Sequence, residues 1–351
     1  MNLPLLIAWV LCVFAGAWWL TGQVRRYALA KRVLDIPNER SSHSVATPRG
    51  GGTAIVAAML ATLPLAASRG WLPWAHVWAL VGAGVLVAAI GFADDRRHLP
   101  RRWRLLGHVT AAIWVLAWLG GLPPVHVFGV AADLGWIGHV LAAVYIVWLI
   151  NLTNFMDGID GIAATEAVTV AGCGALLFAL VIPGDRQWIA PVLLAAAAGG
   201  FLPWNWPPAK IFMGDTGSGF LGLALAALSL QATWAAPALI WSWAILLGVF
   251  VVDATVTLLR RAPGREPFYN PHRTHAYQHA AVRFGAHKPV TIAVAAINLF
   301  WLFPIAFLVA RDSLSGSMGV LVAYVPLVAL AAWLGAGVPR SSGTRLDARH
   351  V

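Results

Sequence analysis

Long apolar runs are the feature that most restricts how this chain can fold. A helix needs about 20 mostly apolar residues to cross the hydrocarbon core of a bilayer, and eleven runs of about that length follow one another along the sequence. They cover residues 4–23, 53–69, 75–92, 105–121, 136–152, 163–182, 188–203, 218–234, 237–259, 289–310 and 318–338. The sequence therefore predicts an all-α, polytopic integral membrane protein with about 11 transmembrane helices.

The composition excludes the main alternatives to a membrane protein. Of the 351 residues, 60% are hydrophobic and only 11% are charged, whereas about 25% of the residues of an average soluble domain are charged. So few charges could not cover a soluble enzyme, and so many apolar residues exclude a disordered chain. The net charge of +10 comes without a nucleic-acid-binding motif. We therefore expect the lipid bilayer, and no nucleic acid, as the partner of these charges.

The Lys and Arg residues predict which side of the membrane each loop occupies. Of these 24 residues, 21 fall on one side if the N-terminus is outside and the C-terminus is cytoplasmic, as the bias of cytoplasmic loops requires. The inner loops are then 25–52, 93–104, 153–162, 204–217 and 260–288, followed by a tail over 339–351. We predict one transmembrane domain over residues 1–338, with a retained first helix and its functional groups in the inner loops.

Carboxylates collect on the same predicted side. Ten of the 14 Asp and Glu residues fall in the inner loops or at the adjoining helix ends, and ionisable groups at membrane depth usually have a functional reason. Oxygen ligands on one face are typical of a Mg²⁺ site, which is normally shared with substrate phosphates. The inner loops also carry Arg, Lys and His, which bind phosphate. These residues predict a site that joins an anionic phosphate substrate to a metal at the cytoplasmic face.

Asp94 and Asp95 end the third apolar run. Adjacent residues on a helix point about 100° apart, so one carboxylate could bind a metal while the other acts as a base or orients the substrate. The alternative is a solvated helix end in which the acids pair with Arg96 or Arg97. Because acids are unfavourable at the negative end of a helix dipole, we favour a functional pair.

Two segments that contain glycine supply further candidates. The first follows the fifth run and carries polar groups at a spacing of three, namely Asn151, Asn154, Asp157 and Asp160. Its glycines allow the backbone to approach a ligand closely, although an ordinary polar turn is the alternative. The second contains Asp215 in a Gly-flanked turn that enters the eighth run. Backbone amides there favour anions, and a plain N-cap is the alternative interpretation.

Two basic loops complete the candidates. His272, Arg273 and His275 lie in the largest late loop, where they could bind zinc or a pyrophosphate. No Cys is near, so we favour contact with phosphate or nucleotide over zinc, against the alternative of a solvated loop. Asn38, Arg40 and His43 lie in an extended early loop that leads through Pro48-Arg49-Gly50-Gly51-Gly52 into the second run. On its own, this loop is weak evidence for function.

Taken in order over residues 35–280, these segments resemble the polyprenyl-phosphate N-acetylhexosamine-1-phosphate transferases. The similarity comprises the Pro-Asn-x-Arg-x-x-His loop, the Asp-Asp pair, the Asn-x-x-Asn-x-x-Asp-Gly-x-Asp-Gly segment, the Phe-x-Gly-Asp-x-Gly-Ser segment and the late His-rich loop. It implies that a polyprenyl phosphate, here undecaprenyl phosphate, attacks the sugar-bearing phosphorus of a UDP-N-acetylaminosugar and releases UMP. It also implies Mg²⁺ as the cofactor, with Mn²⁺ as a substitute.

The resemblance assigns a role to each motif. It implies that Asp94, Asp95 and Asp215 are catalytic, that Asp94 deprotonates or orients the lipid phosphate, and that Asp215 and Asp95 hold the metal. The residues implied on the nucleotide side are Asn151, Asn154, Asp157, Asp160 and Lys210. The pyrophosphate and sugar loop is His272, Arg273 and His275, and the contacts to the lipid phosphate or its loop are Asn38, Arg40 and His43. A phosphate monoester is largely ionised near neutral pH, so a steering role for Asp94 stays open.

Differences from the family pattern indicate which sugar the donor carries. The lipid I-forming enzymes carry a lysine shortly after the Asp pair, where this chain has Arg96, Arg97 and His98. The late loop resembles that of the O-antigen-initiating branch, which implies UDP-GlcNAc, UDP-QuiNAc or UDP-FucNAc as the sugar donor. The resemblance also implies a location in the bacterial inner membrane, and it is compatible with a homodimer. Alternatives are the phospho-MurNAc-pentapeptide transferase and a polytopic transporter. The transporter is disfavoured because the acids gather on one side and no repeat is visible.

Overall fold

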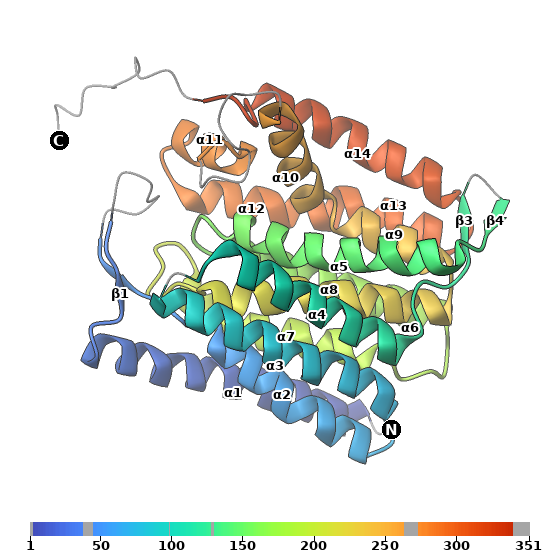
Figure 1. The fold of residues 1–351 in the computed structure, drawn as a ribbon, viewed down its shortest axis with the longest axis horizontal. Coiled ribbons are helices and arrows are strands. Elements are labelled where there is room, and N and C mark those ends of the chain that lie inside the picture. The colour runs from blue at the N-terminus through green and yellow to red at the C-terminus, as the bar shows by residue number, and fades with distance from the viewer. Residues whose placement is uncertain (1–2, 38–44, 98, 128–129, 263–272, 340–351) are drawn as a thin grey trace.

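The computed structural model describes residues 3–37, 45–97, 99–127, 130–262 and 273–339 (Figure 1). Each of the eleven apolar runs lies on helix. The helices are α1 (Leu3–Ala30), α2 (Thr53–Ser68), α3 (Trp74–Arg97), α4 (Arg101–Leu119), α5 (Gly135–Met156), α6 (Ile162–Val181), α7 (Ile189–Asn205), α8 (Asp215–Ala235), α9 (Ala238–Leu246), α10 (Gly248–Arg261), α11 (Ala276–Arg283), α12 (His287–Ile297), the π-helix η1 (Asn298–Leu302), α13 (Phe303–Ala310) and α14 (Gly316–Trp333).

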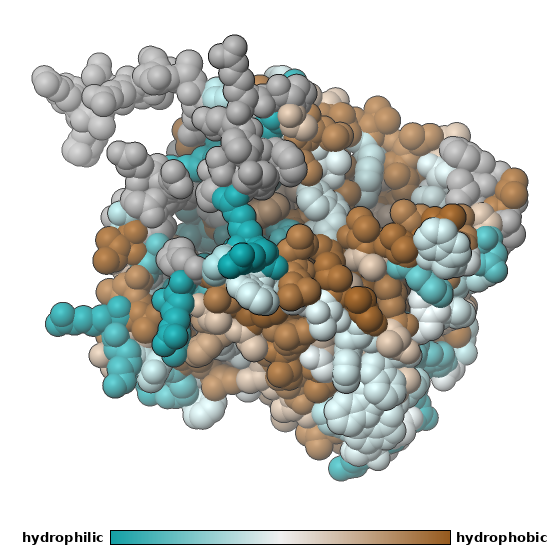
Figure 2. All heavy atoms as spheres, viewed as in Figure 1, coloured by the Kyte–Doolittle hydropathy of each residue, from teal (hydrophilic) through white to brown (hydrophobic). Residues whose placement is uncertain are grey.

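The lengths and compositions of these helices fit a multi-pass membrane protein. Among the described residues, seven helical segments are long and apolar enough to cross a bilayer, and the bent pair α9 and α10 makes an eighth if it is one span. Helices α2 and α7 are apolar but shorter, with 16 and 17 residues. Apolar side chains cover much of the face in Figure 2, where hydrophilic residues gather toward the ends of the molecule. The count of eleven spans and the orientation stay predictions.

Helix α8 lies at the centre of the bundle, because almost every one of its side chains is small or apolar. Its residues from Thr216 to Thr233 are all buried, and it packs against α3 and α5. Glycines let the backbones approach closely, as is usual between membrane helices. A Cβ atom at Gly222 would lie 2.3 Å from the carbonyl oxygen of Leu149 on α5. The backbone of α8 is therefore held tightly against α5.

One predicted span is not a single straight helix. The run 237–259 divides into α9 and α10, which meet at Leu247–Gly248 with a bend of 70°. After the bend, α10 carries polar residues, among them Asp253, whose side chain is bonded to the start of α11. The bend thus brings a buried carboxylate to a polar partner, which hydropathy alone does not indicate.

The loops also differ from the sequence expectation. Helix α1 continues to Ala30, and the late loop contains α11, so less of 25–52 and 260–288 is irregular than we expected. The all-α prediction omitted two antiparallel two-stranded ladders that the structure shows within its described residues. One joins β1 (Leu34–Asp35) to β2 (Thr47–Pro48), and the other joins β3 (Val125–Val127) to β4 (Val130–Ala132). Such short pairings depend on tertiary position, and a hydropathy pattern does not reveal them.

The described parts of the five predicted inner loops meet at one end of the bundle, at the left of Figure 1. Hydrogen bonds and ion pairs join the segment before α2 to the ends of α3 and α8, and the segment before α6 to that before α8. The β3–β4 ladder lies at the opposite end. The folded chain therefore gathers the candidate residues at one end, which we call the site end.

Candidate active site

Asp95 fixes the start of α8 at the site end. Its Oδ1 accepts a hydrogen bond of 2.9 Å from the backbone N–H of Asp215, and its Oδ2 accepts bonds from the backbone N–H and hydroxyl of Thr216 at 3.2 and 3.0 Å. Gly214 has a φ of +79°, and a Cβ there would lie 2.8 Å from Asp95 Oδ2. Two segments 120 residues apart in sequence are thus joined through one carboxylate.

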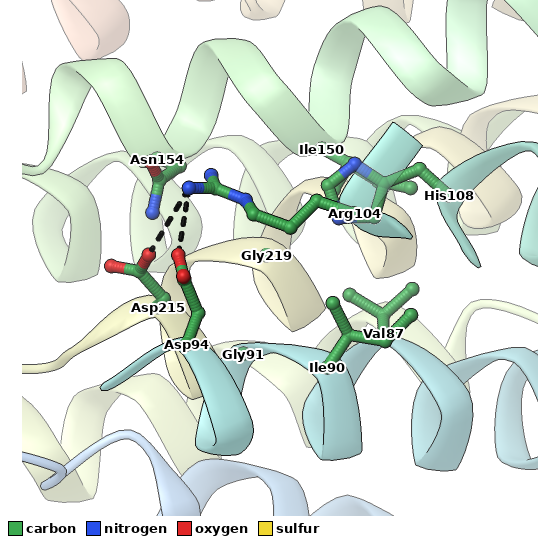
Figure 3. Close-up of a pocket in the computed structure, with 10 residues that line it drawn as sticks. All are labelled: Val87, Ile90, Gly91, Asp94, Arg104, His108, Ile150, Asn154, Asp215 and Gly219. Atoms are coloured by element: carbon green, nitrogen blue, oxygen red, sulfur yellow. Dashed lines mark ion pairs between the residues drawn. The ribbon is translucent and has the colours of Figure 1, made fainter. Parts of the chain in front are cut away.

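Asp94 faces Asp215 across a small pocket (Figure 3). The two carboxyl groups interact directly, and Arg104 on α4 points between them, with Nη1 2.7 Å from Asp94 Oδ2 and 4.0 Å from Asp215 Oδ2. The backbone N–H of Leu99 donates to Asp94 Oδ1 at 2.6 Å. Asn154 also lines the pocket. Facing carboxylates with a guanidinium beside them form a site suited to binding anionic phosphate together with a cation.

Arg49 closes the other side of this carboxylate cluster. Its Nε lies 2.9 Å from Asp95 Oδ1, its Nη2 lies 2.6 Å from Asp215 Oδ1, and its Nη1 lies 4.0 Å from Asp35 Oδ2. Burial lowers the pKa of Arg49, but the carboxylates of Asp215, Asp95 and Asp35 outweigh this effect and raise it overall. The guanidinium therefore stays charged and neutralises part of the cluster.

The backbone around Arg49 is built into the core. The N–H of Phe212 donates to Pro48 O at 2.8 Å, and the N–H groups of Gly50 and Gly51 donate to Phe212 O at 3.1 and 2.9 Å. A Cβ at Gly52 would lie only 2.4 Å from the Cα of Gly217 on α8. The glycine run after Arg49 thus allows close backbone packing, and this packing places the Arg49 side chain beside the carboxylates.

The predicted nucleotide residues divide into two groups. Asn154 lies beside Asp215 and donates to Ser218 Oγ at 3.0 Å, and Asp157 lies within electrostatic reach of Arg49. Burial raises the pKa of Asp157 well above its usual range; Arg49 opposes this shift, and Asp215 adds to it. These two residues belong to the cluster.

The other predicted nucleotide residues, Asn151, Asp160 and Lys210, lie at the edge of the carboxylate cluster. Asn151 donates to Val147 O at 2.7 Å and lies 3.3 Å from Nδ1 of His108. Asp160 accepts from the backbone of Ala209 at 3.0 Å, and Lys210 packs over Trp204.

The late loop is held by a carboxylate on α10. Asp253 accepts hydrogen bonds of 2.9 Å from the backbone N–H groups of both Ala276 and Tyr277, and its Oδ1 lies 3.3 Å from Nδ1 of His275. The Tyr277 hydroxyl donates to Phe155 O at 2.9 Å, beside the Asp157 segment. His275 therefore lies buried at the start of α11. Arg273 is partly buried just before it, whereas His272, Asn38, Arg40 and His43 lie outside the described residues.

The chain is similar to known proteins over most of its length. Residues 77–233, which span α3 to α8, match glycosyl transferase family 4. The chain is 30% identical over 303 residues to the probable undecaprenyl-phosphate N-acetylglucosaminyl 1-phosphate transferase of Bacillus subtilis, covering 84% of this chain and 82% of that one. The chain belongs to the polyprenyl-phosphate N-acetylhexosamine-1-phosphate transferase family.

Other relatives represent two branches of this family. The decaprenyl-phosphate N-acetylglucosaminephosphotransferase of Mycolicibacterium smegmatis is 32% identical over 83% of this chain and 78% of its own length. The phospho-N-acetylmuramoyl-pentapeptide-transferase of Oceanobacillus iheyensis is 30% identical over 59% of this chain and 68% of its own length. The alignment with the second branch covers less of the chain.

The donor groups of this family member suit a hard divalent cation. No group of three or more His, Cys, Asp or Glu residues that could hold a metal occurs within the described part of the chain. Two of the carboxylates, Asp215 and Asp94, are instead paired with Arg49 and Arg104. Mg²⁺, however, usually takes one or two carboxylates together with substrate phosphates and waters. Asp94 and Asp215 supply that number. Both oxygens of Asp95 already accept protein hydrogen bonds.

Four residues at the site end had no role predicted from the sequence, namely Arg49, Arg104, His108 and Asp253. A signal was present for some of them. Asp253 and His108 are polar groups inside apolar runs, and such groups usually have a functional reason. Arg49 and Arg104 were two among many basic loop residues, and nothing in the sequence distinguished them.

Proposed function

We propose that this protein transfers an N-acetylaminosugar 1-phosphate from a UDP-sugar to undecaprenyl phosphate and releases UMP. The observation that carries the proposal is the pair of facing carboxylates, Asp94 and Asp215, with Arg104 on one side and Arg49 on the other. A lipid phosphate and a nucleotide diphosphate both need cationic partners. A site at the end of membrane helices is accessible to a lipid substrate and to a water-soluble one.

The reaction exchanges one phosphorus–oxygen bond for another. An oxygen of the lipid phosphate bonds to the sugar-bearing phosphorus, the bond from that phosphorus to the bridging oxygen breaks, and UMP leaves with the bridging oxygen. Such transfers depend on positioning and charge stabilisation more than on covalent catalysis. Arg104 and Arg49 supply positive charge. Asp94 is held by Leu99 and Arg104, so we assign it an orienting role, because the lipid phosphate is already largely ionised.

A divalent cation completes the proposed site. We assign Mg²⁺, or Mn²⁺ in its place, to Asp215 with Asp94 as the second carboxylate. Asp95 then orients Arg49 and the start of α8, in place of the ligand role that the family resemblance implies. When bound, the cation would neutralise negative charge on the diphosphate. Asn154 and Asp157 are the nucleotide-side residues nearest the cluster.

The relatives favour UDP-GlcNAc as donor. Names of relatives that cover 83–84% of this chain refer to N-acetylglucosamine. UDP-QuiNAc and UDP-FucNAc remain the other donors of the O-antigen-initiating branch, and the product would begin a cell-envelope polysaccharide. UDP-MurNAc-pentapeptide is the second candidate, because the Oceanobacillus iheyensis relative is named for it. The basic residues favour the cytoplasmic face of the bacterial inner membrane for the site end.

UMP release by the purified protein tests this proposal. Undecaprenyl phosphate is supplied with each of the four UDP-sugars, with Mg²⁺ or with a chelator. We expect UMP from UDP-GlcNAc only when lipid and cation are both present. Asp215→Asn should lower turnover about 100-fold or more. The matched change Asp312→Asn, at an exposed residue outside the site, should leave turnover unchanged. Full turnover in Asp215→Asn, or none from any donor in folded protein, contradicts the proposal.

A further inference from the structure

The single positive charge of Arg49 is shared among three carboxylates. Each of its three side-chain nitrogens is directed to a different carboxylate: Nε to Asp95, Nη2 to Asp215 and, at a longer distance, Nη1 to Asp35. Its contact with Asp215, at 2.6 Å, is the shortest of the three. That carboxylate is also the one to which we assign the divalent cation. The guanidinium and the cation are therefore candidates for the same oxygen atoms.

The backbone and one end of the guanidinium are fixed. Arg49 N–H donates to Val33 O at 3.3 Å, and the neighbouring residues bond to Phe212 on both sides. Asp95, which holds Nε, is itself held by the first amides of α8. The Nη2 atom can therefore change partner by a rotation of the side-chain end, without movement of the segment that carries it.

Electrostatics oppose simultaneous occupation of Asp215 by both groups. Two positive charges a few ångströms apart repel strongly where water is scarce. The side chains of Asp215 and Arg49 are only 19% and 30% exposed, so screening by solvent is weak there. A doubly charged cation at Asp215 must therefore weaken the Arg49 contact, and the Arg49 contact must weaken cation binding. The diphosphate of a donor would offer the displaced nitrogen new acceptors of the right charge.

We propose that Arg49 is an internal counterion that competes with the divalent cation for Asp215. When cation and donor bind, Nη2 moves from Asp215 to the diphosphate, while Nε stays on Asp95. In the absence of donor the site binds the cation weakly, and donor and cation strengthen each other's binding. This inference rests on the proposed function, and it assigns to Arg49 a substrate contact and a control over cation affinity.

Mn²⁺ binding, measured by the electron paramagnetic resonance signal of the free ion, tests this without catalysis. The protein is held in nanodiscs with no nucleotide present. Arg49→Gln should bind Mn²⁺ about 10-fold more tightly than the wild type, and Asp215→Asn should lose the site. Arg283→Gln removes an exposed positive charge from α11 and should leave Mn²⁺ affinity unchanged. With UDP added, the gain in Mn²⁺ affinity should be smaller in Arg49→Gln than in the wild type.

The outcomes separate this inference from the proposed function. If Asp215→Asn abolishes Mn²⁺ binding but Arg49→Gln binds it no more tightly than the wild type, the competition is refuted and the cation assignment stands. If Asp215→Asn binds Mn²⁺ like the wild type, the cation assignment itself fails. Arg49→Lys guards against a folding defect, because it keeps the charge but cannot bond Asp95 and Asp215 together. It should bind Mn²⁺ with an affinity between those of wild type and Arg49→Gln, and an affinity below that of the wild type overturns the proposal.

Discussion

Replacing Asp253 by Asn should release the N-terminal end of α11 from α10. The Asp253 carboxylate accepts two backbone hydrogen bonds of 2.9 Å, from Ala276 and Tyr277, and a third of 3.1 Å from the Thr257 hydroxyl. Its side chain is buried, so water does not replace a lost acceptor. An Asn side chain keeps one acceptor oxygen and turns an amide NH₂ toward one of the two backbone N–H groups.

The structure sets the size of this effect. A hydrogen bond to a charged group contributes about 1.5–3 kcal/mol, and a buried donor left without an acceptor costs about 1–3 kcal/mol. One lost bond and one orphaned N–H therefore lower the free energy of local opening by about 3 kcal/mol, or roughly 100-fold in the opening equilibrium. Thr257→Val removes a hydrogen bond within α10 and leaves both carboxylate oxygens of Asp253 to accept from the backbone N–H groups of α11. Its effect on the opening of α11 should therefore be about 10-fold or less.

Amide hydrogen exchange measures this opening directly. In Asp253→Asn, the amides of Ala276–Arg283 should exchange about 100-fold faster than in the wild type, while those of α8 keep their protection. Because Tyr277 bonds to Phe155, the Asp157 segment should also exchange faster, by a smaller factor. Unchanged exchange in α11 would refute the assigned role of Asp253. An equal rise in the exchange rate of every helix would show a global loss of stability, and it would also refute the local role assigned to Asp253.

Three further substitutions test the packing and charge of the site. Gly91→Ala places a Cβ 2.5 Å from the Asp215 carbonyl oxygen, so it should cost about 1–3 kcal/mol of stability and lower UMP release. As a control, the Cβ of Gly172→Ala meets no atom within 4 Å, so this change should alter neither stability nor UMP release. Arg104→Gln leaves Asp94 without its cation and should lower turnover about 100-fold in the same assay. Burial raises the pKa of Asp157, so its ionisation costs stability as pH rises above the ordinary aspartate value. Asp157→Asn should therefore raise Tm at mildly alkaline pH but not near about pH 4, while lowering UMP release.

The helices and the gathering of acids could be predicted from the sequence, because both depend on hydropathy. Each apolar run became helix, and Asp94, Asp95 and Asp215, expected on one side of the membrane, meet at the site end. The bend between α9 and α10 could not be predicted. No Pro interrupts the chain at Leu247–Gly248, and the hydrogen bond between Asp253 on α10 and Ala276 on α11 joins residues 23 positions apart, which hydropathy does not indicate.

The partners of the acids were not predictable for a different reason. An arginine in a loop gives no sign in the sequence of which carboxylate it will meet. Arg49 reaches Asp215 only because β2 lies beside Phe212, and Arg104 reaches Asp94 only because α4 turns back along α3. The Arg49 contact joins segments 166 residues apart, so it follows from the packing of the whole bundle. The Arg104 contact crosses the short turn between α3 and α4, so it follows from the direction in which α4 leaves that turn.

The most direct test of the central claim is the fate of the sugar-bearing phosphorus. UDP-GlcNAc labelled with ³²P at that position is incubated with undecaprenyl phosphate, Mg²⁺ and the purified protein, and the lipid and nucleotide fractions are separated. Transfer of a sugar 1-phosphate predicts that the label enters the lipid and that the released nucleotide is unlabelled UMP. Labelled UDP in the nucleotide fraction, with an unlabelled lipid product, would show transfer of the sugar alone and contradict the account.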